Sequence, residues 1–461
     1  MKSICNRFGA LLVVTGAMAL NGVAWGDGSV LAWGLNDYGQ CNIPADALSG
    51  VTVIATGSYY HTIVLKGGAV LAWGAGTTNT GSFPEYGQSI IPNAAKSGVT
   101  AIAGGWMHTI AIKNGGVLAW GDNYYGQCNV PADALSGVTA VAGGYYHTFA
   151  LKNGAVLTWG KDDQSSVPAN ANSGVTAIAG EHLNTIALKN GSVLTWGNNF
   201  YGQCNIPADA LSGVTAVAGG YSHTVALKNG TVLVWGKNAS GQCLGTDTSG
   251  SRIISPIADG TVPVQINGFT LTGVTAIASG HFYTIALKGG AVLAWGANTS
   301  GQYDIPASAN SGVTAIAGGG WHTIALKVAT ITGVLPISGP SSGNTNITIT
   351  GTNFEAPATV TIGGAPAINV VLVSDTQITA TTPEGFPGPA VVTVNLGSST
   401  AFYYRPTCGA DLDNNNVVDS ADLGYLLLEF GNCSSESAAA TETVEPVRIP
   451  MIDQTPLAEK K

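Results

Sequence analysis

Short runs of apolar residues, each bounded by glycine-containing turns, recur along residues 27–327. In a representative unit we expect strands at Val138–Ala142, His147–Leu151 and Ala155–Trp159, followed by a weaker outer strand beyond the next loop. The second strand ends in a lysine that precedes Asn-Gly, which is a strong signal for a tight hairpin turn. Each unit is therefore predicted to be an antiparallel sheet of four short strands.

Three sequence marks each occur seven times in this region. A Ser/Thr-Gly-Val-Thr segment opens each unit, a strand ending in Lys follows, and a Trp-Gly pair ends the third strand. Four-stranded units that repeat about every 40 residues are typical of a β-propeller, in which blades pack face to face and bury both sheet faces. The Trp-Gly pairs begin at Trp33, Trp73, Trp120, Trp159, Trp196, Trp235 and Trp295.

The order of the marks predicts how the ring of blades closes. The first mark, Asp27–Gly34, is a turn and a third strand with no first or second strand before it. The last mark is a pair of first and second strands that ends at Lys327 with no third strand after it. A blade assembled from both ends would leave no exposed sheet edge. We therefore predict an all-β fold with a seven-bladed propeller over residues 27–327, closed by both chain ends.

These units resemble regulator-of-chromosome-condensation repeats. The segment from Val117 to Thr139, which contains Trp-Gly, Gly-Gln-Cys and Ser-Gly-Val-Thr, is most similar to the secreted bacterial members of the β-lactamase-inhibitory type. Nuclear members of the family act as nucleotide-exchange factors for a small GTPase. An export signal argues against that role in this chain.

Residues 1–26 are predicted to be a cleaved signal peptide. Lys2 and Arg7 precede an apolar stretch from Phe8 to Leu20, and small residues lie near the end of that stretch and after it. An N-terminal membrane anchor is the alternative, but the stretch is short beside the ~20 residues that a bilayer span needs. We expect an exported protein, located outside the cell, on its surface or in the periplasm, with no integral membrane span in the mature chain.

Residues 328–406 change to short alternating strands with Gly and Pro turns, such as Asn346–Phe354 and Ala358–Gly364. This pattern predicts a small β-sandwich. The segment Pro340–Phe354, together with Ser374–Pro383, resembles an IPT/TIG immunoglobulin-like domain. We see no catalytic chemistry there and expect a spacer or a contact module.

Residues 407–434 contain a twelve-residue loop with oxygen side chains at the spacing of an EF-hand-like calcium site. A short helix with apolar residues at helical spacing is expected to follow. Asp at the last position resembles a dockerin repeat, but Asn416 replaces the usual Gly and only one loop is present, so cohesin binding does not follow. The expected Ca²⁺ ligands are Asp411, Asp413, Asn415, Val417 through its carbonyl, Asp419 and Asp422.

The six cysteines that follow the predicted signal peptide fall into two groups. Cys408 and Cys433 flank the calcium loop, and we expect them to form a disulfide in an oxidising compartment. Four others occupy equivalent Gly-Gln-Cys loops of separate blades. Because packed sheets lie ~10 Å apart, the distance between equivalent cysteines exceeds the ~7 Å Cα–Cα limit for a disulfide. These four are expected not to pair: Cys41, Cys128, Cys204 and Cys243. Residues 435–461 lack periodicity and are predicted to be a disordered tail.

Composition and charge exclude some classes of function. Only 9% of residues are charged, and 17 Lys plus Arg against 26 Asp plus Glu give a formal net charge of −9, which argues against nucleic-acid binding. The acids share no repeated spacing, and histidines at equivalent positions of separate blades cannot converge on one ion. We expect a monomeric, non-enzymatic binding protein. The alternatives are a polysaccharide hydrolase or lyase on a propeller scaffold and, implied by the resemblance, an inhibitor of a β-lactamase or another enzyme.

Strand parity places the turns between first and second strands at the same end of the propeller as the loops that follow third strands. Aromatic residues are concentrated at this end, whereas the Lys-Asn-Gly turns lie at the other. Tyr and Trp are enriched in binding hot spots, although the alternative is that half of these side chains pack between blades. The predicted binding surface for a protein or a cell-surface glycan comprises Tyr38, Tyr59, Tyr60, Trp106, Tyr124, Tyr125, Tyr145, Tyr146, Phe200, Tyr201, Tyr221, Phe282 and Trp321.

Overall fold

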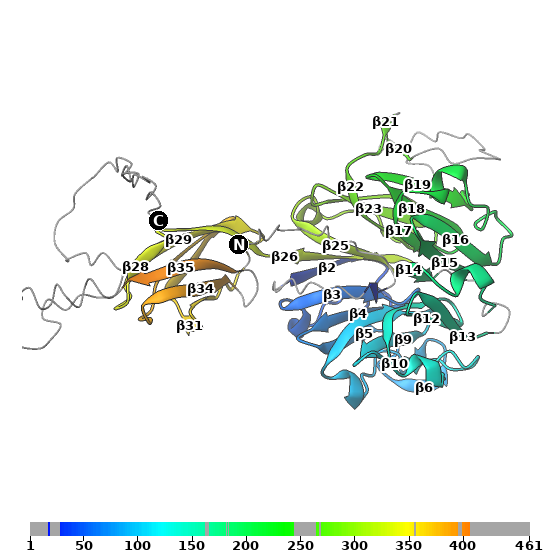
Figure 1. The fold of residues 1–461 in the computed structure, drawn as a ribbon, viewed down its shortest axis with the longest axis horizontal. Coiled ribbons are helices and arrows are strands. Elements are labelled where there is room, and N and C mark those ends of the chain that lie inside the picture. Colours follow the sequence, from blue (N-terminus) through cyan, green and yellow to red (C-terminus); the bar gives the residue numbers. More distant parts are fainter. Residues whose placement is uncertain are drawn as a thin grey trace, which may run out of the picture.

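Antiparallel three-stranded sheets follow one another along the chain (Figure 1), as seen in a computed structural model. The representative unit consists of β11 (Val138–Gly143), β12 (His147–Lys152) and β13 (Ala155–Gly160), which confirms its three expected inner strands. The structure describes residues 17–18, 28–161, 166–180, 182, 184–243, 264–266, 269–354, 356–394 and 399–405.

The same meander recurs in the other sheets, which we call blades. Each hairpin from second to third strand turns tightly, and four of these turns place an Asn at φ of 50–52°, the left-handed conformation of a type I′ turn. The strands are β3 (Val51–Thr56), β4 (His61–Lys66), β5 (Ala69–Gly74); β8 (Val99–Gly104), β9 (His108–Lys113), β10 (Gly116–Gly121); β14 (Val175–Gly180), β15 (Asn184–Lys189), β16 (Ser192–Gly197); β17 (Val214–Gly219), β18 (His223–Lys228), β19 (Thr231–Gly236); β22 (Val274–Ser279), β23 (Tyr283–Lys288), β24 (Ala291–Gly296).

The prediction of an outer fourth strand is wrong for the described residues. A 3₁₀ turn replaces it and begins directly after a proline, which has no N–H to contribute to a strand ladder. An alanine of each turn is fully buried, and the lysine at the end of the second strand donates to a carbonyl of the turn, as Lys66 Nζ does to Asp46 O at 2.8 Å. The turns are η1 (Ala45–Ala47), η2 (Asn93–Ala95), η3 (Ala132–Ala134), η5 (Ala169–Ala171), η6 (Ala208–Leu211) and η7 (Ala307–Ala309).

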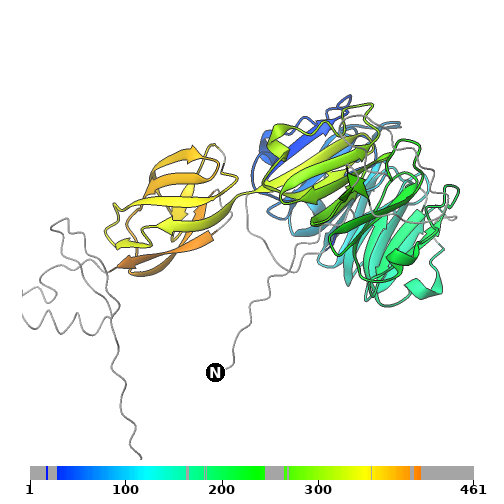
Figure 2. The same ribbon diagram turned by 90° about the horizontal axis from the view of Figure 1, so that it is seen from above.

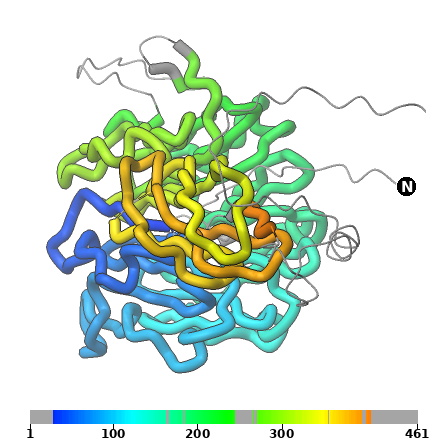
Figure 3. The backbone as a smooth tube through the Cα atoms, turned by 90° about the vertical axis from the view of Figure 1, so that its left-hand side faces the viewer, coloured from blue at the N-terminus to red at the C-terminus, as the bar shows by residue number. Residues whose placement is uncertain are grey.

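Strands from the two ends of the propeller region share one sheet. β25 (Val313–Gly318) pairs with β26 (His322–Val328), and β26 pairs along its length with β2 (Gly28–Gly34), from Gly28 opposite Val328 to Gly34 opposite His322. In Figure 3 the colours run round a ring until the yellow-green of β25 and β26 lies beside the blue of β2.

Four shorter strands and one edge pairing complete this region. β6 (Asn79–Ser82) and β7 (Glu85–Tyr86) form a hairpin that follows β5, and β20 (Gln265–Ile266) pairs with β21 (Phe269–Thr270). The two-residue strand β1 (Ala17–Met18) pairs with β11.

The blades are held together by apolar side chains on facing sheets. One such core joins Ile110 and Ile112 of β9 to Val138 and Val141 of β11 and to Trp159 of β13, all at most 8% exposed. Because burial on both sheet faces removes most apolar area from water, a chain with few charges folds without long helices. No helix in the described part of the chain has the length and apolar character that a membrane crossing needs.

Residues 330–405 form two facing sheets, which confirms the predicted β-sandwich. Ile349, Phe354, Ile378, Phe402 and Tyr404 lie buried between them. One sheet has the order β27 (Thr330–Leu335), β29 (Asn346–Thr352), β33 (Gln377–Thr381), β32 (Ile368–Ser374); the other has β28 (Ser338–Pro340), β35 (Ser399–Arg405), β34 (Gly388–Val394), β30 (Val360–Ile362), β31 (Ala365–Pro366).

A short junction joins the sandwich to the propeller (Figures 1 and 2). Only Ala329 separates β26 from β27. Asn353 of the sandwich donates through Nδ2 to Gly312 O at 2.8 Å and to Val328 O at 2.9 Å. Both acceptors lie at the propeller end that carries the lysines, so the sandwich is attached there and not at the opposite, aromatic end.

Deletion of residues 28–34 should destabilise the whole propeller. It removes the strand that pairs with β26, and it removes the side chain of Trp33, which is only 8% exposed. We expect the free energy of unfolding to fall by at least about 3 kcal/mol, the cost of losing one buried Trp side chain. Urea unfolding and limited proteolysis measure this, with deletion of residues 435–461 as the control. A β2 deletion as resistant as the full chain would show that this pairing does not support the ring.

Candidate functional site: an aromatic face at one end of the propeller

Buried histidines position the turns from which the aromatic residues project. The first residue of the second strand is a fully buried His in five blades. The His reaches into the next blade: Nε2 of His61 lies 3.2 Å from Thr109 Oγ1, and that of His108 lies 3.0 Å from Thr148 Oγ1. The same contact joins His322 to Thr62 at 3.2 Å, between the β25–β26–β2 and β3–β5 blades.

A backbone carbonyl in each of six interblade loops accepts two side-chain hydrogen bonds. Thr62 Oγ1 donates to Gln40 O at 2.8 Å, and Trp73 Nε1 donates to the same oxygen at 3.0 Å. The side chain of this Gln then accepts from the backbone N of Tyr38 at 3.0 Å, so the loop tyrosine is tied to the blade core. Equivalent carbonyls with both donors belong to Gln88, Gln127, Gln203, Gln242 and Gln302.

Glycines allow the turn to pass over the buried imidazole. A Cβ at Gly57 would lie 1.9 Å from His61 Cε1, and one at Gly105 would lie 2.0 Å from His108 Cε1. Any side chain there would displace the His from its Thr partner. The aromatic residues between this glycine and the buried His, such as Tyr59 and Trp106, therefore emerge at a fixed place above the blade.

Six of these side chains form a closed chain of ring contacts around the propeller axis, which we call the central ring. Trp106 stacks on Tyr145 with centroids 4.0 Å apart, and His182 stacks on Tyr221 at 3.9 Å. The equivalent position in the β25–β26 turn is Gly320, where a Cβ would lie 3.0 Å from His281 Cε1. The members are Tyr59, Trp106, Tyr145, His182, Tyr221 and His281.

Loop tyrosines lie outside the central ring, and two of them contact the tyrosine that precedes a buried His. Tyr38 lies 4.6 Å from Tyr60, and Tyr125 lies 4.5 Å from Tyr146, between ring centroids. The most exposed members are Tyr124 at 84% and Phe200 at 82%. All thirteen predicted residues lie at this end: Tyr38, Tyr124, Tyr125, Phe200 and Tyr201 are exposed, and Tyr59, Tyr60, Trp106, Tyr145, Tyr146, Tyr221, Phe282 and Trp321 are half-buried.

The structure adds three residues that the aromatic prediction left out. His182 and His281 complete the central ring, and their alignment two places before the strand was the available signal. Phe83, which is 50% exposed, follows β6 and contacts Tyr60 and Trp106. Among the interblade loops that the structure describes, the β6–β7 hairpin follows β5 alone, so no repeat in the sequence predicted it. We call the thirteen residues and these three the aromatic face.

Few charges accompany the aromatic face. Lys237 Nζ lies 4.7 Å from the ring centroids of both Tyr201 and Phe282, and Lys161 Nζ lies 5.6 Å from that of Tyr125, which are cation–π distances. Asp122 is 6% exposed and accepts from Gln127 Nε2 at 2.9 Å, so it holds its loop in place. Among the described residues, no group of three His, Cys, Asp or Glu side chains is placed to hold a metal ion.

The other predicted sites are the calcium loop and the cysteines. The calcium ligands from Asp411 to Asp422 and the Cys408–Cys433 disulfide lie outside the described residues. Each Gly-Gln-Cys thiol donates to a carbonyl of its own loop, as Cys41 Sγ does to Leu35 O at 3.3 Å. Burial raises the pKa of Cys41 and of Cys128 to about 12, so both thiols stay protonated at neutral pH.

Comparisons with known proteins identify the two kinds of domain. The model of the regulator of chromosome condensation (RCC1) repeat matches residues 229–287, a second RCC1 repeat model matches residues 99–127 and 214–242, and the IPT/TIG domain model matches residues 329–407. The chain therefore contains RCC1 repeats followed by an IPT/TIG domain. No curated protein matches it.

Two solved structures are similar to this chain. Prp20p from Saccharomyces cerevisiae is 16% identical with a TM-score of 0.50, over 67% of this chain and 92% of that one. Human WBSCR16 is 19% identical with a TM-score of 0.49, over 65% of this chain and 98% of that one. At 16% identity the likeness to Prp20p concerns the fold alone, which is an RCC1-like β-propeller.

The buried imidazoles should make the fold sensitive to acid. Burial, with a smaller effect of His322 and His108, lowers the pKa of His61 to about 3, and burial lowers that of His223 to about 3. Both fall below the ~6.5 of an unfolded chain, so the stability they contribute is complete above pH 6.5 and is lost as the pH falls toward 3. Between pH 7.5 and 5, each should cost about 2 kcal/mol of unfolding free energy.

Urea unfolding at the two pH values measures this loss in the wild-type chain and in His61→Asn and His223→Asn. Asn occupies the equivalent position, Asn184, in β15, so the substitution suits the fold. Each variant should show about 2 kcal/mol less loss than the wild type. A pH dependence that is the same in all three chains would contradict the assignment.

Proposed function

We propose that this protein is a non-enzymatic binding protein whose aromatic face binds a protein or glycan partner. The observation that carries the proposal is the continuity of the aromatic face: ring contacts link the turns of neighbouring blades, and exposed Tyr and Phe side chains surround them. Exposed aromatic surface of this kind marks interaction sites, because large rigid rings bury much apolar area at a low cost in side-chain entropy.

The architecture supports this assignment. The IPT/TIG domain is attached at the lysine end, since Asn353 contacts Gly312 and Val328 there, and so leaves the aromatic face open. Trp321 directly precedes the seven-residue strand β26, and Val328 is its last residue. The aromatic and lysine ends of the propeller are therefore roughly 20 Å apart. Prp20p, which has the same type of fold, is described by its binding to Gsp1p and histones, so this scaffold serves protein binding elsewhere.

The finer features belong to the same proposal. The ring has seven blades closed by β2 and β26, supported by the pairing of these strands. The protein is exported by residues 1–26, supported by their charge and apolar pattern, and the loop from Asp411 to Asp422 binds Ca²⁺, supported by its oxygen ligands. Inhibition of a β-lactamase or another secreted enzyme would be one form of the binding function.

Truncation of a central aromatic side chain should weaken binding. Trp106→Ala removes a ring that stacks on Tyr145 and contacts Tyr59, and Tyr125→Ala removes the partner of Tyr146. We expect each to cost on the order of 2 kcal/mol of affinity, as hot-spot residues do. The partner is first isolated with the wild-type chain from the secreted and envelope fractions of the source cells, and affinities are then measured by calorimetry.

The matched control is Lys152→Ala at the opposite end, where the lysine only donates to Asp133 O. Its affinity should equal that of the wild type. Equal losses in Lys152→Ala and Trp106→Ala would show that the partner does not select the aromatic face.

A further inference from the structure

One position in the aromatic face departs from the repeated pairing of rings. Loop tyrosines Tyr38 and Tyr125 each contact a second tyrosine, Tyr60 and Tyr146 respectively. Tyr201 occupies the same loop position as Tyr38, since its backbone N also donates to the side chain of the loop Gln. The residue that corresponds to Tyr60 in its neighbouring blade is Ser222, which is 5% exposed. A small side chain therefore stands where a large ring is found elsewhere.

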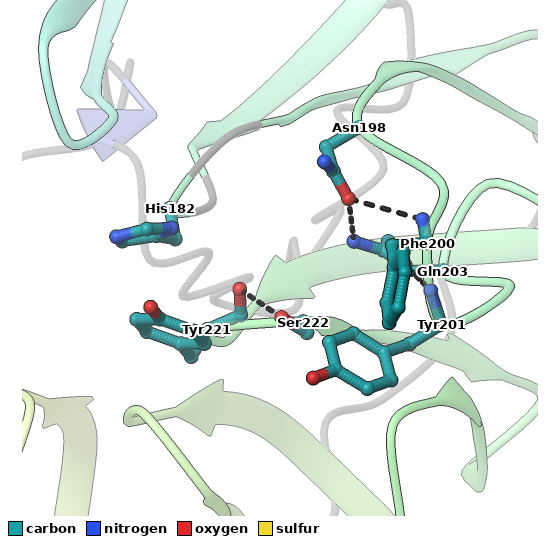
Figure 4. Close-up of a pocket in the computed structure, with 7 residues that line it drawn as sticks. All are labelled: His182, Asn198, Phe200, Tyr201, Gln203, Tyr221 and Ser222. Atoms are coloured by element: carbon teal, nitrogen blue, oxygen red, sulfur yellow. Dashed lines mark hydrogen bonds between the residues drawn. The ribbon is translucent and has the colours of Figure 1, made fainter.

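A pocket of about 200 Å³ lies at this position (Figure 4). Figure 4 shows His182 and Tyr221 on one side and Phe200 and Tyr201 on the other, with Ser222 between them. Asn198 and Gln203 complete the lining. The exposed rings, at 82% for Phe200 and 44% for Tyr201, give the pocket apolar walls that open to solvent.

Polar groups in the pocket are held in fixed orientations. Asn198 Oδ1 accepts from the backbone N of Phe200 at 3.0 Å and from Gln203 Nε2 at 3.1 Å. Its Nδ2 has no hydrogen-bond partner among the residues that the structure describes. Burial, with a smaller effect of Lys161, lowers the pKa of His182 to about 4, so the imidazole beside the pocket is uncharged at neutral pH.

Lys237 supplies the positive charge at the edge of the pocket. Its Nζ lies 4.7 Å from the ring centroid of Tyr201, 4.7 Å from that of Phe282 and 6.0 Å from that of Tyr221. The stem of the side chain is half-buried, and within the described part of the chain no carboxylate forms an ion pair with it. A ligand that brings a carboxylate to this edge would meet a cation already held in place by three rings.

We propose that this pocket binds one pyranose ring that bears a carboxylate, a unit of an acidic polysaccharide. The apolar C–H face of a pyranose packs on aromatic rings, its hydroxyls match the Asn198 amide, and its carboxylate pairs with Lys237. The volume is below the 300–1,000 Å³ typical of drug-sized sites, which suits a single ring better than a folded peptide segment. The proposal rests on the function assigned to the aromatic face and names its ligand class.

Calorimetry on the full chain tests the site with trisaccharides of galacturonic, glucuronic and mannuronic acid and with their methyl esters as uncharged controls. At least one acid should bind, and its ester should bind up to about fivefold more weakly because it lacks the ion pair with Lys237. Ser222→Tyr, which installs the ring found in two other blades, should reduce the affinity by at least about tenfold. Lys237→Met, which keeps an apolar stem over the rings, should remove the preference for the acid over the ester.

Lys152→Ala is the control, because this lysine lies at the opposite end of the propeller, where it donates to Asp133 O, and the variant should bind the sugar as the wild type does. The proposal is overturned if no uronate trisaccharide binds, or if Ser222→Tyr and Lys152→Ala bind equally well. Binding of a poly-glutamate peptide alone, lost in Ser222→Tyr, would overturn it in favour of an acidic protein ligand. Partner capture that is lost in Trp106→Ala but kept in Ser222→Tyr, without sugar binding, would overturn the sugar site and leave the proposed function standing.

Discussion

A shared backbone carbonyl in the interblade loop is the contact on which the propeller depends. The Gln carbonyl accepts from a Thr of the second strand and from the Trp of the third, as Gln127 O does from Thr148 Oγ1 at 2.8 Å and Trp159 Nε1 at 3.0 Å. All three groups are buried, and an unpaired member would lose its hydration without a replacement. Because the same Thr also meets a His of the preceding blade, the contact ties a loop and two sheets together.

The aromatic face follows from this arrangement of buried polar groups. Once the His is fixed, the turn before it can pass only over a glycine, and the next side chains must project from the end of the blade. Their identity then decides the local surface. Tyr at position 60 or 146 fills the space beside a loop tyrosine, whereas Ser222 leaves a pocket beside Tyr201. The buried hydrogen bonds that stabilise the fold are thus the same in several blades, whereas the residues exposed above them differ from blade to blade.

The two ends of the propeller differ for a related reason. At one end the lysines donate to carbonyls of the 3₁₀ turns and the Asn-Gly hairpins close tightly, so most polar groups have internal partners. The IPT/TIG domain joins there, through Ala329 and the hydrogen bonds of Asn353. The other end keeps exposed rings and few charges. The attachment of the second domain therefore leaves the chemically distinctive surface accessible.

Local patterns in the sequence determined the three inner strands of each blade, the Asn-Gly hairpins and the β-sandwich, because hydrophobic runs and turn residues act on neighbouring positions. They also placed the thirteen aromatic residues at one end, since strand parity follows from the order of strands. The outer strand was wrong because proline and a buried alanine favoured a 3₁₀ turn, and this preference depends on the space between two blades. Only the tertiary structure decided that Thr109 pairs with His61, that His182 and His281 complete the central ring, and that Ser222 leaves a pocket. Those contacts join residues roughly one blade apart or more, and their geometry is set by how the sheets pack rather than by any local preference.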